Sequence, residues 1–391
     1  MKTEWVHKKL GDDDVAKIIM GQSPSSASYN DENIGLPFLQ GCADFGEVFP
    51  KTSVYCNEPL KVAPQNSILM SVRAPVGTIN KADQKYIIGR GLCSIVSLIN
   101  NDYLYYYLLQ NKNRLEQKAQ GSTFLAINSA EVNDFDVSYP ESLSTQRRIA
   151  AILTSADKVI AATQKTIAKY KQIKQGMMED LLNEQCTMNN VQWRKVKLGE
   201  CCESELGKTL DEGRNTGLYR PYLCALNVLW GKIDRSTIKR MRIEDSELER
   251  YLVKKGDLLV CEGGEIGRCA IWDYDDVIYY QNALHRVRFY DGYDARFFMY
   301  LLCHYNDLKL IEQYGKGLTI KHLNQTAFRN IPVCVPDLAA QRRIAAILSG
   351  IDAKIAAEEK VLQKYEKVKK GLMEKLLNEQ CKRKEMKKTE I

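Results

Sequence analysis

Apolar side chains recur at alternating steps of four and three residues in two long stretches of the chain. The first series is Ile149, Leu153, Ala156, Ile160, Thr163, Ile167, Tyr170, Lys174, Met177 and Leu181. The second series is Ile344, Leu348, Ile351, Ile355, Glu358, Leu362, Tyr365, Lys369, Leu372 and Leu376. This spacing is typical of the seam of a coiled coil, so both stretches are predicted to be long helices. Each begins shortly after a proline, Pro140 or Pro336, which cannot lie inside a regular helix.

The two helical stretches are copies of one another. Residues 144–186 align with residues 339–381 without a gap, and 25 of the 43 positions are identical. Further apolar residues, among them Ile152 and Ile347, widen each stripe beyond the seam. A stripe of this width predicts that each helix contacts more than one neighbour, although a simple two-helix hairpin needs no further partner.

The segments before the two helices share a weaker likeness. Gly21-Gln22-Ser23 corresponds to Gly207-Lys208-Thr209, and the apolar run at 68–70 corresponds to the run at 258–260. Short β-branched runs separated by Gly, Asn and Pro predict strands and turns, whereas residues 103–118 and 295–313 are predicted to be helical. The fold class is therefore α+β, with two similar mixed α/β globular domains alternating with two long helices.

Four segments follow from this repeat. We expect a first globular domain at 1–142, a first long helix at 143–188, a second globular domain at 189–338, and a second long helix with a basic tail at 339–391. Similar scaffolds with few identities between them suggest two related sites that recognise different targets.

Composition narrows the class of protein. The 391 residues include 12 cysteines, but no C-x-x-C pair occurs, so neither a zinc site nor any other metal site is predicted. No apolar run approaches the roughly 20 residues that span a bilayer, and the first residues lack an apolar signal core, so we expect a cytoplasmic protein without a membrane partner.

The net charge of +7 is unevenly distributed along the chain. Residues 146–185, 341–380 and 381–391 each carry +3, so the rest of the chain carries −2. A general basic-patch argument for binding nucleic acid therefore favours the helices and the tail over the globular domains.

Catalytic motifs are incomplete in this sequence. Gly207-Lys208-Thr209 ends like a phosphate-binding loop, but Cys202 stands where the first glycine of that loop belongs. Gly263-Gly264-Glu265-Ile266-Gly267 lacks dinucleotide-loop spacing and is better explained as a turn with positive φ. Pro336-Asp337 followed by Asp352-Ala353-Lys354 has the residue types of a metal-dependent nuclease, but the latter part lies inside the predicted helix. We therefore predict that the chain is not an enzyme.

Two repeated motifs carry a resemblance to a known family. The run Gln-Arg-Arg-Ile-Ala-Ala-Ile-Leu occurs at 146–153 and again at 341–348, and Gly176-Met-Met-Glu-Asp-Leu-Leu182 is paralleled by Gly371-Leu-Met-Glu-Lys-Leu-Leu377. Together with the alternation of globular and helical segments, these motifs resemble the specificity subunit of type I restriction-modification systems. The resemblance covers the whole chain and is strongest in the helices.

That resemblance implies a function carried out with partners. Each globular domain would be a target-recognition domain that reads one half of a split, asymmetric site in double-stranded DNA. The helices would pack as an antiparallel coiled coil, fix the distance between half-sites and dock two methylation subunits. Cofactors would be absent from this chain, because S-adenosylmethionine belongs to the methylation subunits, and ATP and Mg²⁺ to restriction and motor subunits.

The candidate DNA-binding residues lie in both globular domains. Arg and Lys side chains suit phosphate contacts, whereas Gln, Asn and Arg can also read base edges. In the second domain they are Lys232, Arg235, Lys239, Arg240, Arg242, Gln281, Asn282, His285 and Arg286. In the first domain they are Gln22, Arg73, Lys81, Lys85 and Arg90.

The residues predicted to contact partner subunits lie near the start of each helix. They are Gln146, Arg147, Arg148 and Ile152 in the first helix, and Gln341, Arg342, Arg343 and Ile347 in the second. Two other functions remain open on the sequence alone. One is a stand-alone bipartite DNA-binding regulator, and the other is a coiled-coil scaffold that does not read sequence.

Overall fold

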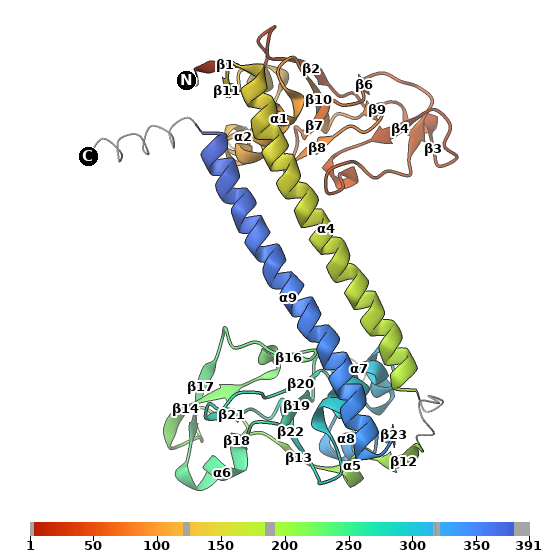
Figure 1. Cartoon of the computed structure of the whole chain (residues 1–391), viewed down its shortest axis with the longest axis vertical. Coiled ribbons are helices and arrows are strands. Elements are labelled where there is room, and N and C mark those ends of the chain that lie inside the picture. The colour runs from red at the N-terminus through yellow and green to blue at the C-terminus, as the bar shows by residue number, and fades with distance from the viewer. Residues whose placement is uncertain (1–3, 120–125, 184–191, 316, 318–320, 379–391) are drawn as a thin grey trace, which may run out of the picture. The chain divides into compact units, whose positions relative to one another are not determined.

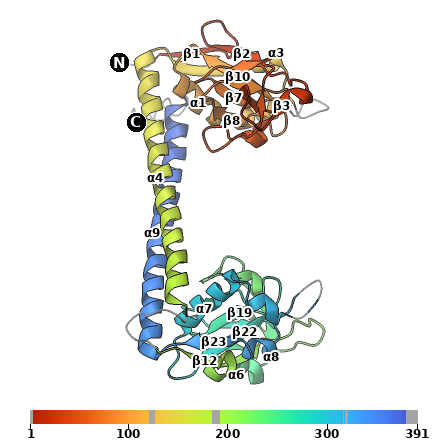
Figure 2. The same ribbon diagram turned by 90° about the vertical axis from the view of Figure 1, so that its right-hand side faces the viewer.

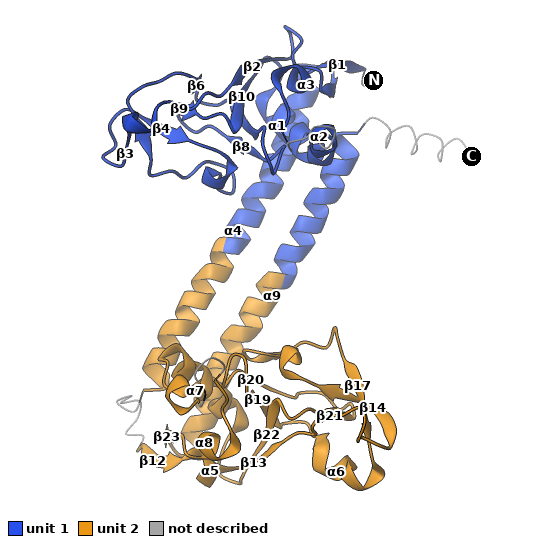
Figure 3. Ribbon diagram, turned by 180° about the vertical axis from the view of Figure 1, so that it is seen from behind, with its two compact units in different colours: residues 1–164, 360–391 blue, residues 165–359 orange. Residues whose placement is uncertain are grey.

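The computed structural model describes residues 4–119, 126–183, 192–315, 317 and 321–378 (Figure 1). The basic tail at 381–391 lies outside these described residues. The chain divides into two compact units (Figure 3): unit 1 contains residues 1–164 and 360–391, and unit 2 contains residues 165–359. Each unit therefore contains a globular part and a portion of both long helices.

The predicted long helices are present. Helix α4 spans Leu143–Leu181 and helix α9 spans Leu338–Leu376, and each has 39 residues. Both begin at equivalent positions of the repeat, two or three residues after the prolines that exclude an earlier start. Gly176 and Gly371 lie inside the helices, so neither glycine ends its helix.

The globular part of unit 1 combines strands with a few short helices. A four-stranded sheet has the order β2-β10-β7-β8 (Figure 2). A second sheet has the order β3-β5-β4-β9-β6, and β1 pairs with β11. The strands are β1 Trp5–Lys9, β2 Ala16–Met20, β3 Tyr29–Asn30, β4 Leu36–Leu39, β5 Tyr55–Cys56, β6 Val62–Ala63, β7 Ile68–Ser71, β8 Ile79–Lys81, β9 Tyr86–Ile88, β10 Leu92–Ser97 and β11 Asp136–Pro140. The helices are α1 Asn101–Gln110, α2 Lys112–Ala119 and α3 Ser129–Asn133.

The globular part of unit 2 repeats much of this plan. A four-stranded sheet has the order β13-β22-β19-β20, another has the order β17-β14-β21-β18, β12 pairs with β23 and β15 with β16. The strands are β12 Arg194–Lys197, β13 Cys202–Leu206, β14 Leu218–Leu223, β15 Val228–Leu229, β16 Lys232–Ile233, β17 Lys239–Ile243, β18 Leu252–Val253, β19 Leu258–Cys261, β20 Cys269–Ile271, β21 Ile278–Tyr280, β22 Leu284–Phe289 and β23 Pro332–Val335. The helices are α5 Leu198–Cys201, α6 Leu248–Tyr251, α7 Ala295–Asp307 and α8 Gln325–Arg329.

In unit 1 the two long helices contribute to one hydrophobic core. Ile149 and Leu153 of α4 are buried in the same cluster as Met373 of α9 and Leu377, which follows it. The Asp157 carboxylate of α4 also lies 2.5 Å from the Lys369 ammonium of α9. Since later positions in α4 pair with earlier positions in α9, the helix segments of this unit run antiparallel.

Unit 2 contains the equivalent arrangement. Ile344 and Leu348 of α9 share a core cluster with Met178 and Leu181 of α4. Two ion pairs join the helix segments in this unit: Lys171 with Glu359 at 3.0 Å and Lys174 with Asp352 at 2.7 Å. The order of these pairs again shows antiparallel packing. The expected fold class is therefore confirmed, including the mixed α/β globular parts and the paired long helices.

Candidate nucleic-acid interface

A basic edge strand stands out in unit 2. Strand β17 lies at the edge of its sheet and pairs with β14. Met241 and Ile243 point into the core, whereas Arg240 and Arg242 alternate with them and are exposed. The Arg242 guanidinium lies 5.1 Å from the centre of the exposed Tyr219 ring, which is the geometry of a cation–π contact. Arginines beside an exposed aromatic ring form a surface suited to nucleic acid.

The other basic candidates of this run are also exposed, but they are not equally available. Lys232 and Lys239 are exposed at the ends of short strands. The Arg235 guanidinium is ion-paired with Asp276 and lies 4.4 Å from the centre of the Tyr274 ring. Arg235 is therefore already held by neighbouring side chains, whereas Lys232 and Lys239 extend into solvent.

Two candidates of unit 2 are buried, which corrects the prediction that they reach base edges. His285 and Arg286 are 0% and 4% exposed. They lie on β22, an interior strand of its sheet, and both faces of that strand are covered. Their polar character reflects internal contacts, which the sequence pattern does not distinguish from contacts with a ligand.

The burial of His285 fixes its protonation. Its Nε2–H donates to the Leu323 carbonyl oxygen at 2.6 Å, and its ring stacks on Phe328. Nδ1 is buried and has no hydrogen-bond partner among the described residues. A second ring proton would therefore have no acceptor, and desolvation lowers the pKa of His285 to about 4.

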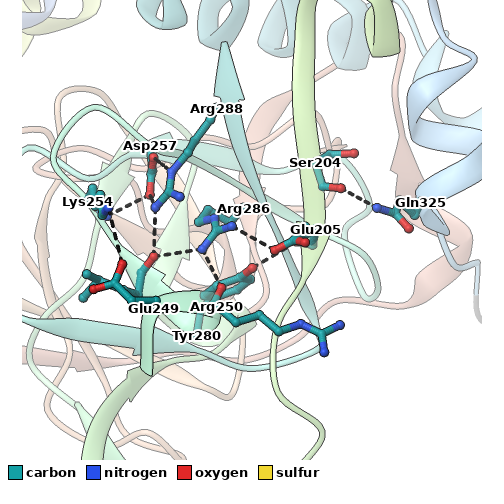
Figure 4. A network of polar contacts seen from close by, with 11 residues as sticks. Ser204, Glu205, Glu249, Arg250, Lys254, Asp257, Tyr280, Arg286, Arg288 and Gln325 are labelled. Carbon is teal, nitrogen blue, oxygen red and sulfur yellow. Dashed lines mark hydrogen bonds and ion pairs between the residues drawn. The ribbon is translucent and has the colours of Figure 1, made fainter. Parts of the chain in front are cut away.

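Arg286 is the centre of a polar network inside unit 2 (Figure 4). Its guanidinium binds the Glu205 carboxylate at 2.9 Å and the carbonyl oxygens of Arg250 and Leu252 at 2.6 and 3.0 Å. Arg288 forms a two-pronged ion pair with Asp257 close by. Because these contacts join β22 to α6 and to β18 of the second four-stranded sheet, the network holds the two four-stranded sheets of unit 2 together.

The loop before β22 contains the remaining candidates of unit 2. Gln281 and Asn282 are half-buried, and their backbone groups bind Leu223 and Lys208 of neighbouring segments. The loop is therefore fixed in position while the amide side chains remain at the surface. This placement is compatible with the predicted contact to base edges.

The first-domain candidates fall into two groups in unit 1. Arg73 and Arg90 are exposed and line one cleft of about 240 Å³, and Gln22 lies on the adjoining loop. Lys81 is instead bound by Asp102 at 2.6 Å and covers the Tyr105 ring at 4.3 Å, so it fastens β8 to α1. Lys85 is exposed just before β9, outside the residues that line the cleft.

The residues predicted to contact partner subunits include both buried and exposed side chains. Gln146 and Gln341 are 2% and 0% exposed, which corrects their assignment to a partner surface. Gln146 accepts from the Asn100 backbone N–H at 2.9 Å and donates to the Pro140 carbonyl at 2.8 Å. Gln341 makes the same contacts with Asp294 and Pro336. These two glutamines anchor the start of each long helix to the adjacent globular part.

The remaining helix candidates do face solvent. Arg147, Arg148, Arg342 and Arg343 are exposed. Ile152 is 37% exposed, and Ile347 is half-buried beside the core of unit 2. Val159 on α4 and Val368 on α9 are 40% and 47% exposed. The apolar stripe of each long helix therefore extends to solvent-exposed positions in unit 1.

Sequence reasoning missed a junction that occurs in both units. In unit 1 the Tyr106 hydroxyl donates to Asp157 at 2.6 Å, and Lys369 pairs with the same carboxylate. In unit 2 Tyr300 donates to Asp352 at 2.7 Å, and Lys174 pairs with it. The signal was available, because the aspartates and lysines recur at identical positions of the helical repeat.

The residues of the incomplete catalytic motifs have structural roles. Lys208 is bound by the Glu247 carboxylate at 2.6 Å, and Gly264 adopts φ +74° as expected for a turn. Asp352, part of the nuclease-like pattern, is held by Tyr300 and Lys174. Among the described residues no group of three His, Cys, Asp or Glu side chains is placed to hold a metal ion. Within the same part of the chain, every helix is too short or too polar to cross a membrane.

Comparison with known proteins identifies the domain type. The sequence matches the model of the type I restriction modification DNA specificity domain twice, over residues 2–172 and 190–367. The boundaries of the two matches follow the internal repeat, since each includes one globular segment and most of the helix after it.

Two curated relatives from Methanocaldococcus jannaschii are similar to this chain. The putative type I restriction enzyme MjaX specificity subunit is 41% identical over 182 residues, which is 46% of this chain and 43% of that protein. The chain therefore aligns with less than half of that relative. The type I restriction enzyme MjaVIII specificity subunit is 25% identical over 300 residues, covering 72% of this chain and 70% of that protein.

Solved structures share the fold. The S subunit of a type I restriction-modification system from M. genitalium matches with a TM-score of 0.65 at 17% identity, covering 97% of each chain. A chain from a structure of type I R-M system assembly and conformational transition matches with a TM-score of 0.61 at 16% identity. That match covers 97% of this chain and 99% of the other. At these identities the likeness concerns the fold.

Proposed function

Because the chain belongs to the type I restriction modification DNA specificity domain family, we propose that it is the DNA-reading subunit of such a system. It reads a bipartite, asymmetric site in double-stranded DNA and directs adenine methylation or cleavage by partner subunits. Specificity subunits are a non-catalytic class, and this chain supplies recognition.

The duplication is the observation that carries this proposal. The specificity domain is matched twice in one chain, and the two copies differ in most residues of their globular parts. One chain with two different copies presents two different surfaces, as an asymmetric site in two halves requires. Residues 1–142 and 189–338 are the two target-recognition domains in this proposal.

The exposed side chains support contact with DNA. Arg240, Arg242 and Lys239 in unit 2 and Arg73 and Arg90 in unit 1 suit contacts with phosphates or base edges. The buried Arg286 and the ion-paired Lys81 play no part in DNA contact.

The long helices are proposed to dock two methylation subunits, one near the start of each helix. Exposed arginines and the partly exposed Ile152 and Ile347 supply mixed basic and apolar surfaces there. S-adenosylmethionine is then bound by the methylation subunits, and ATP and Mg²⁺ by restriction and motor subunits. This chain requires no cofactor of its own.

The test is to compare the purified chain with a complex of the chain and its cognate methylation subunit. The complex is expected to methylate adenine at one bipartite sequence, whereas the chain alone has no methyltransferase or nuclease activity. Sequencing the DNA for methylated adenines gives both half-sites.

Two outcomes would contradict the proposal. Tight, sequence-specific binding by the chain alone, with no association with the methylation subunit, would indicate a stand-alone regulator. A complex without any sequence preference would indicate a scaffold.

A further inference from the structure

Four strands of unit 1 end at one place. Strands β4 and β9 are parallel, and β2 and β7 both run antiparallel to β10, so each pair shares a direction. Backbone bonds join their C-terminal ends: Gln22 N–H donates to Ile88, Gly89 to Leu39 and Val72 to Gly91, all at 2.8–2.9 Å. We call residues 22–23, 40–41, 73–74 and 89–91 the strand-end edge of unit 1.

Unit 2 builds the same edge from its own strands. Lys208 N–H donates to Tyr280, Gln281 to Leu223 and Glu262 to Ala283, at 2.9–3.0 Å. These bonds correspond one by one to those of unit 1. The isolated bridge of Arg73 with Ala126 also has a counterpart in Gly263 with His322. The strand-end edge of unit 2 therefore comprises residues 208–209, 224–225, 263–264 and 281–283.

The close approach of backbones explains the repeated glycine at the start of each edge. A Cβ atom on Gly21 would lie 2.1 Å from the Gly89 carbonyl oxygen, and one on Gly207 would lie 2.4 Å from that of Tyr280. Neither distance is possible for a real side chain, so both positions require glycine. The backbone of the edge is thus fixed in the same way in both copies.

The side chains on this common backbone differ. By the backbone bonds and the bridge, Arg73 of unit 1 is equivalent to Gly263 of unit 2. In the same way, Gly89 is equivalent to Gln281, and Arg90 to Asn282. In unit 1 both arginines line the cleft of about 240 Å³ and form no ion pair with a described residue. In unit 2 Glu247 binds the Lys208 ammonium at 2.6 Å, so this lysine is not available to a ligand. The edge of unit 2 therefore presents the side-chain amides of Gln281 and Asn282.

Resting on the proposed function, we infer that the two strand-end edges are the base-reading surfaces of the two domains. Arg73 and Arg90 read guanine in one half-site, and Gln281 and Asn282 read adenine in the other. Arginine pairs with the O6 and N7 atoms of guanine, and Asn or Gln with the N6 and N7 atoms of adenine.

The pattern of replacement favours bases over phosphates. Phosphates carry the same charge in every sequence, so a surface that contacts only phosphates has no need for different residues in the two copies. Here the backbone framework is retained while arginines in one copy are replaced by Gly and Asn in the other. Such replacement changes the hydrogen-bonding groups offered to DNA and leaves the framework intact.

The experiment transfers residues of one edge to the other in the full-length chain. Arg90→Asn and Arg73→Gly place the residues of unit 2 into unit 1. Each variant is combined with the cognate methylation subunit and given randomised duplex DNA, and methylated adenines are sequenced. We expect Arg90→Asn to lower the preference for guanine at one position of one half-site by roughly tenfold to a hundredfold. The other half-site stays unchanged.

Matched variants make the result specific. Gln281→Ala and Asn282→Ala should relax adenine preference in the opposite half-site only. Lys17→Ala removes an exposed positive charge on β2 outside the edge and should change neither half-site. Thermal unfolding of each variant checks whether the fold is retained. Should Arg73→Gly disturb the loop, Arg90→Asn decides the question alone.

The outcomes separate this inference from the function on which it rests. Equal weakening on all sequences by Arg90→Asn would show phosphate contact and overturn the base-reading role. Unchanged preferences in a folded, active variant would overturn it as well. If the unaltered complex itself shows no sequence preference, the proposed function fails before the edge is tested.

Discussion

The Tyr106 hydroxyl donates a 2.6 Å hydrogen bond to the Asp157 carboxylate, and so joins α1 of the globular part to α4 in unit 1. Tyr300 and Asp352 form the same bond in unit 2 at 2.7 Å. In both units a lysine of the other long helix, Lys369 or Lys174, pairs with the carboxylate. One buried tyrosine therefore connects a globular part to both helix segments of its unit.

Removing this hydroxyl should destabilise the protein without altering its surface. Tyr106→Phe leaves the ring in place but deprives Asp157 of a hydrogen bond, and a bond to a charged group contributes about 1.5–3 kcal/mol. We expect the free energy of unfolding to fall by this amount in Tyr106→Phe and similarly in Tyr300→Phe. Urea denaturation followed by circular dichroism measures it.

An exposed tyrosine of the long helix α9 provides the control. Tyr365 is 38% exposed, so Tyr365→Phe is expected to leave the unfolding midpoint unchanged. Equal midpoints for Tyr106→Phe and the unaltered chain would show that the junction contributes nothing to stability.

The buried histidine of unit 2 predicts a pH dependence. The pKa of His285 is lowered to about 4 in the folded chain, compared with about 6.5 when it is unfolded. Between pH 6.5 and 4 His285 is therefore protonated in the unfolded state but largely neutral in the folded state. Stability is fully present above pH 6.5 and falls by up to about 3 kcal/mol as the pH drops to 4.

His285→Gln isolates this contribution, since the glutamine amide can still donate to the Leu323 carbonyl oxygen. The variant should lose less stability than the unaltered chain between pH 7 and 4.5, measured by thermal unfolding at each pH. His7→Gln changes an exposed histidine and serves as the control. Parallel pH curves for His285→Gln and the unaltered chain would argue against this role of His285.

The helical part of the fold was predictable because its pattern is local. Ile149, Leu153 and Ile160 were placed on the seam from their spacing, and all three are buried. The same spacing recurs in the second helix, which supports the same period independently. A helix needs only contacts within a few residues, so its sequence contains most of the information.

The errors concerned polar residues whose partners lie far away in the sequence. Gln146 is followed by two arginines and was therefore predicted to lie at the surface, but it binds the backbone of Asn100, 46 residues earlier. From the sequence, Arg286 was predicted to contact DNA, yet its two terminal guanidinium nitrogens bind Glu205 and two carbonyl oxygens inside unit 2. A polar residue looks the same in sequence whether protein or ligand supplies its partner. Arg73 and Arg90 were predicted as candidates, but only the fold brings them to one cleft.

The basic edge strand of unit 2 should contribute to DNA affinity through charge. Replacing Arg240 and Arg242 by Gln removes two potential phosphate contacts from β17. We expect weaker binding of the methylating complex to all duplexes, and a salt dependence of log K that is shallower by about one for each arginine replaced. Fluorescence anisotropy at several salt concentrations measures both quantities.

The sequence preference should not change in this variant, which distinguishes β17 from the strand-end edges. Lys309→Gln removes an exposed charge after α7 and should leave the salt dependence as it was. A change of preferred half-site on replacing Arg240 and Arg242 would mean that β17 reads bases.

The two target-recognition domains should be exchangeable one at a time. Replacing residues 1–140 by the equivalent segment of another family member is expected to change one half-site and to leave the other unchanged. The Gln146 anchor lies after this junction, so its contacts to the Asn100 and Pro140 backbones can re-form with any sequence that keeps the fold. Methylated adenines in the DNA of cells carrying the hybrid report both half-sites. Simultaneous change of both halves would refute the assignment of one domain to each half-site.

The exposed apolar face of α4 in unit 1 should carry the contact with a methylation subunit. Ile152 and Val159 are 37% and 40% exposed and lie seven residues apart, so they share one face of the helix. Replacing both by Glu puts two charges into the proposed contact but costs the isolated chain little, since neither side chain is fully buried. We expect the double variant to keep its unfolding midpoint and to lose co-purification with the methylation subunit. Lys158→Glu and Lys165→Glu alter the charge of exposed residues on the same helix without filling an apolar contact, and should retain the complex better. If the complex forms normally with Ile152→Glu and Val159→Glu, the methylation subunit docks on another surface of the chain.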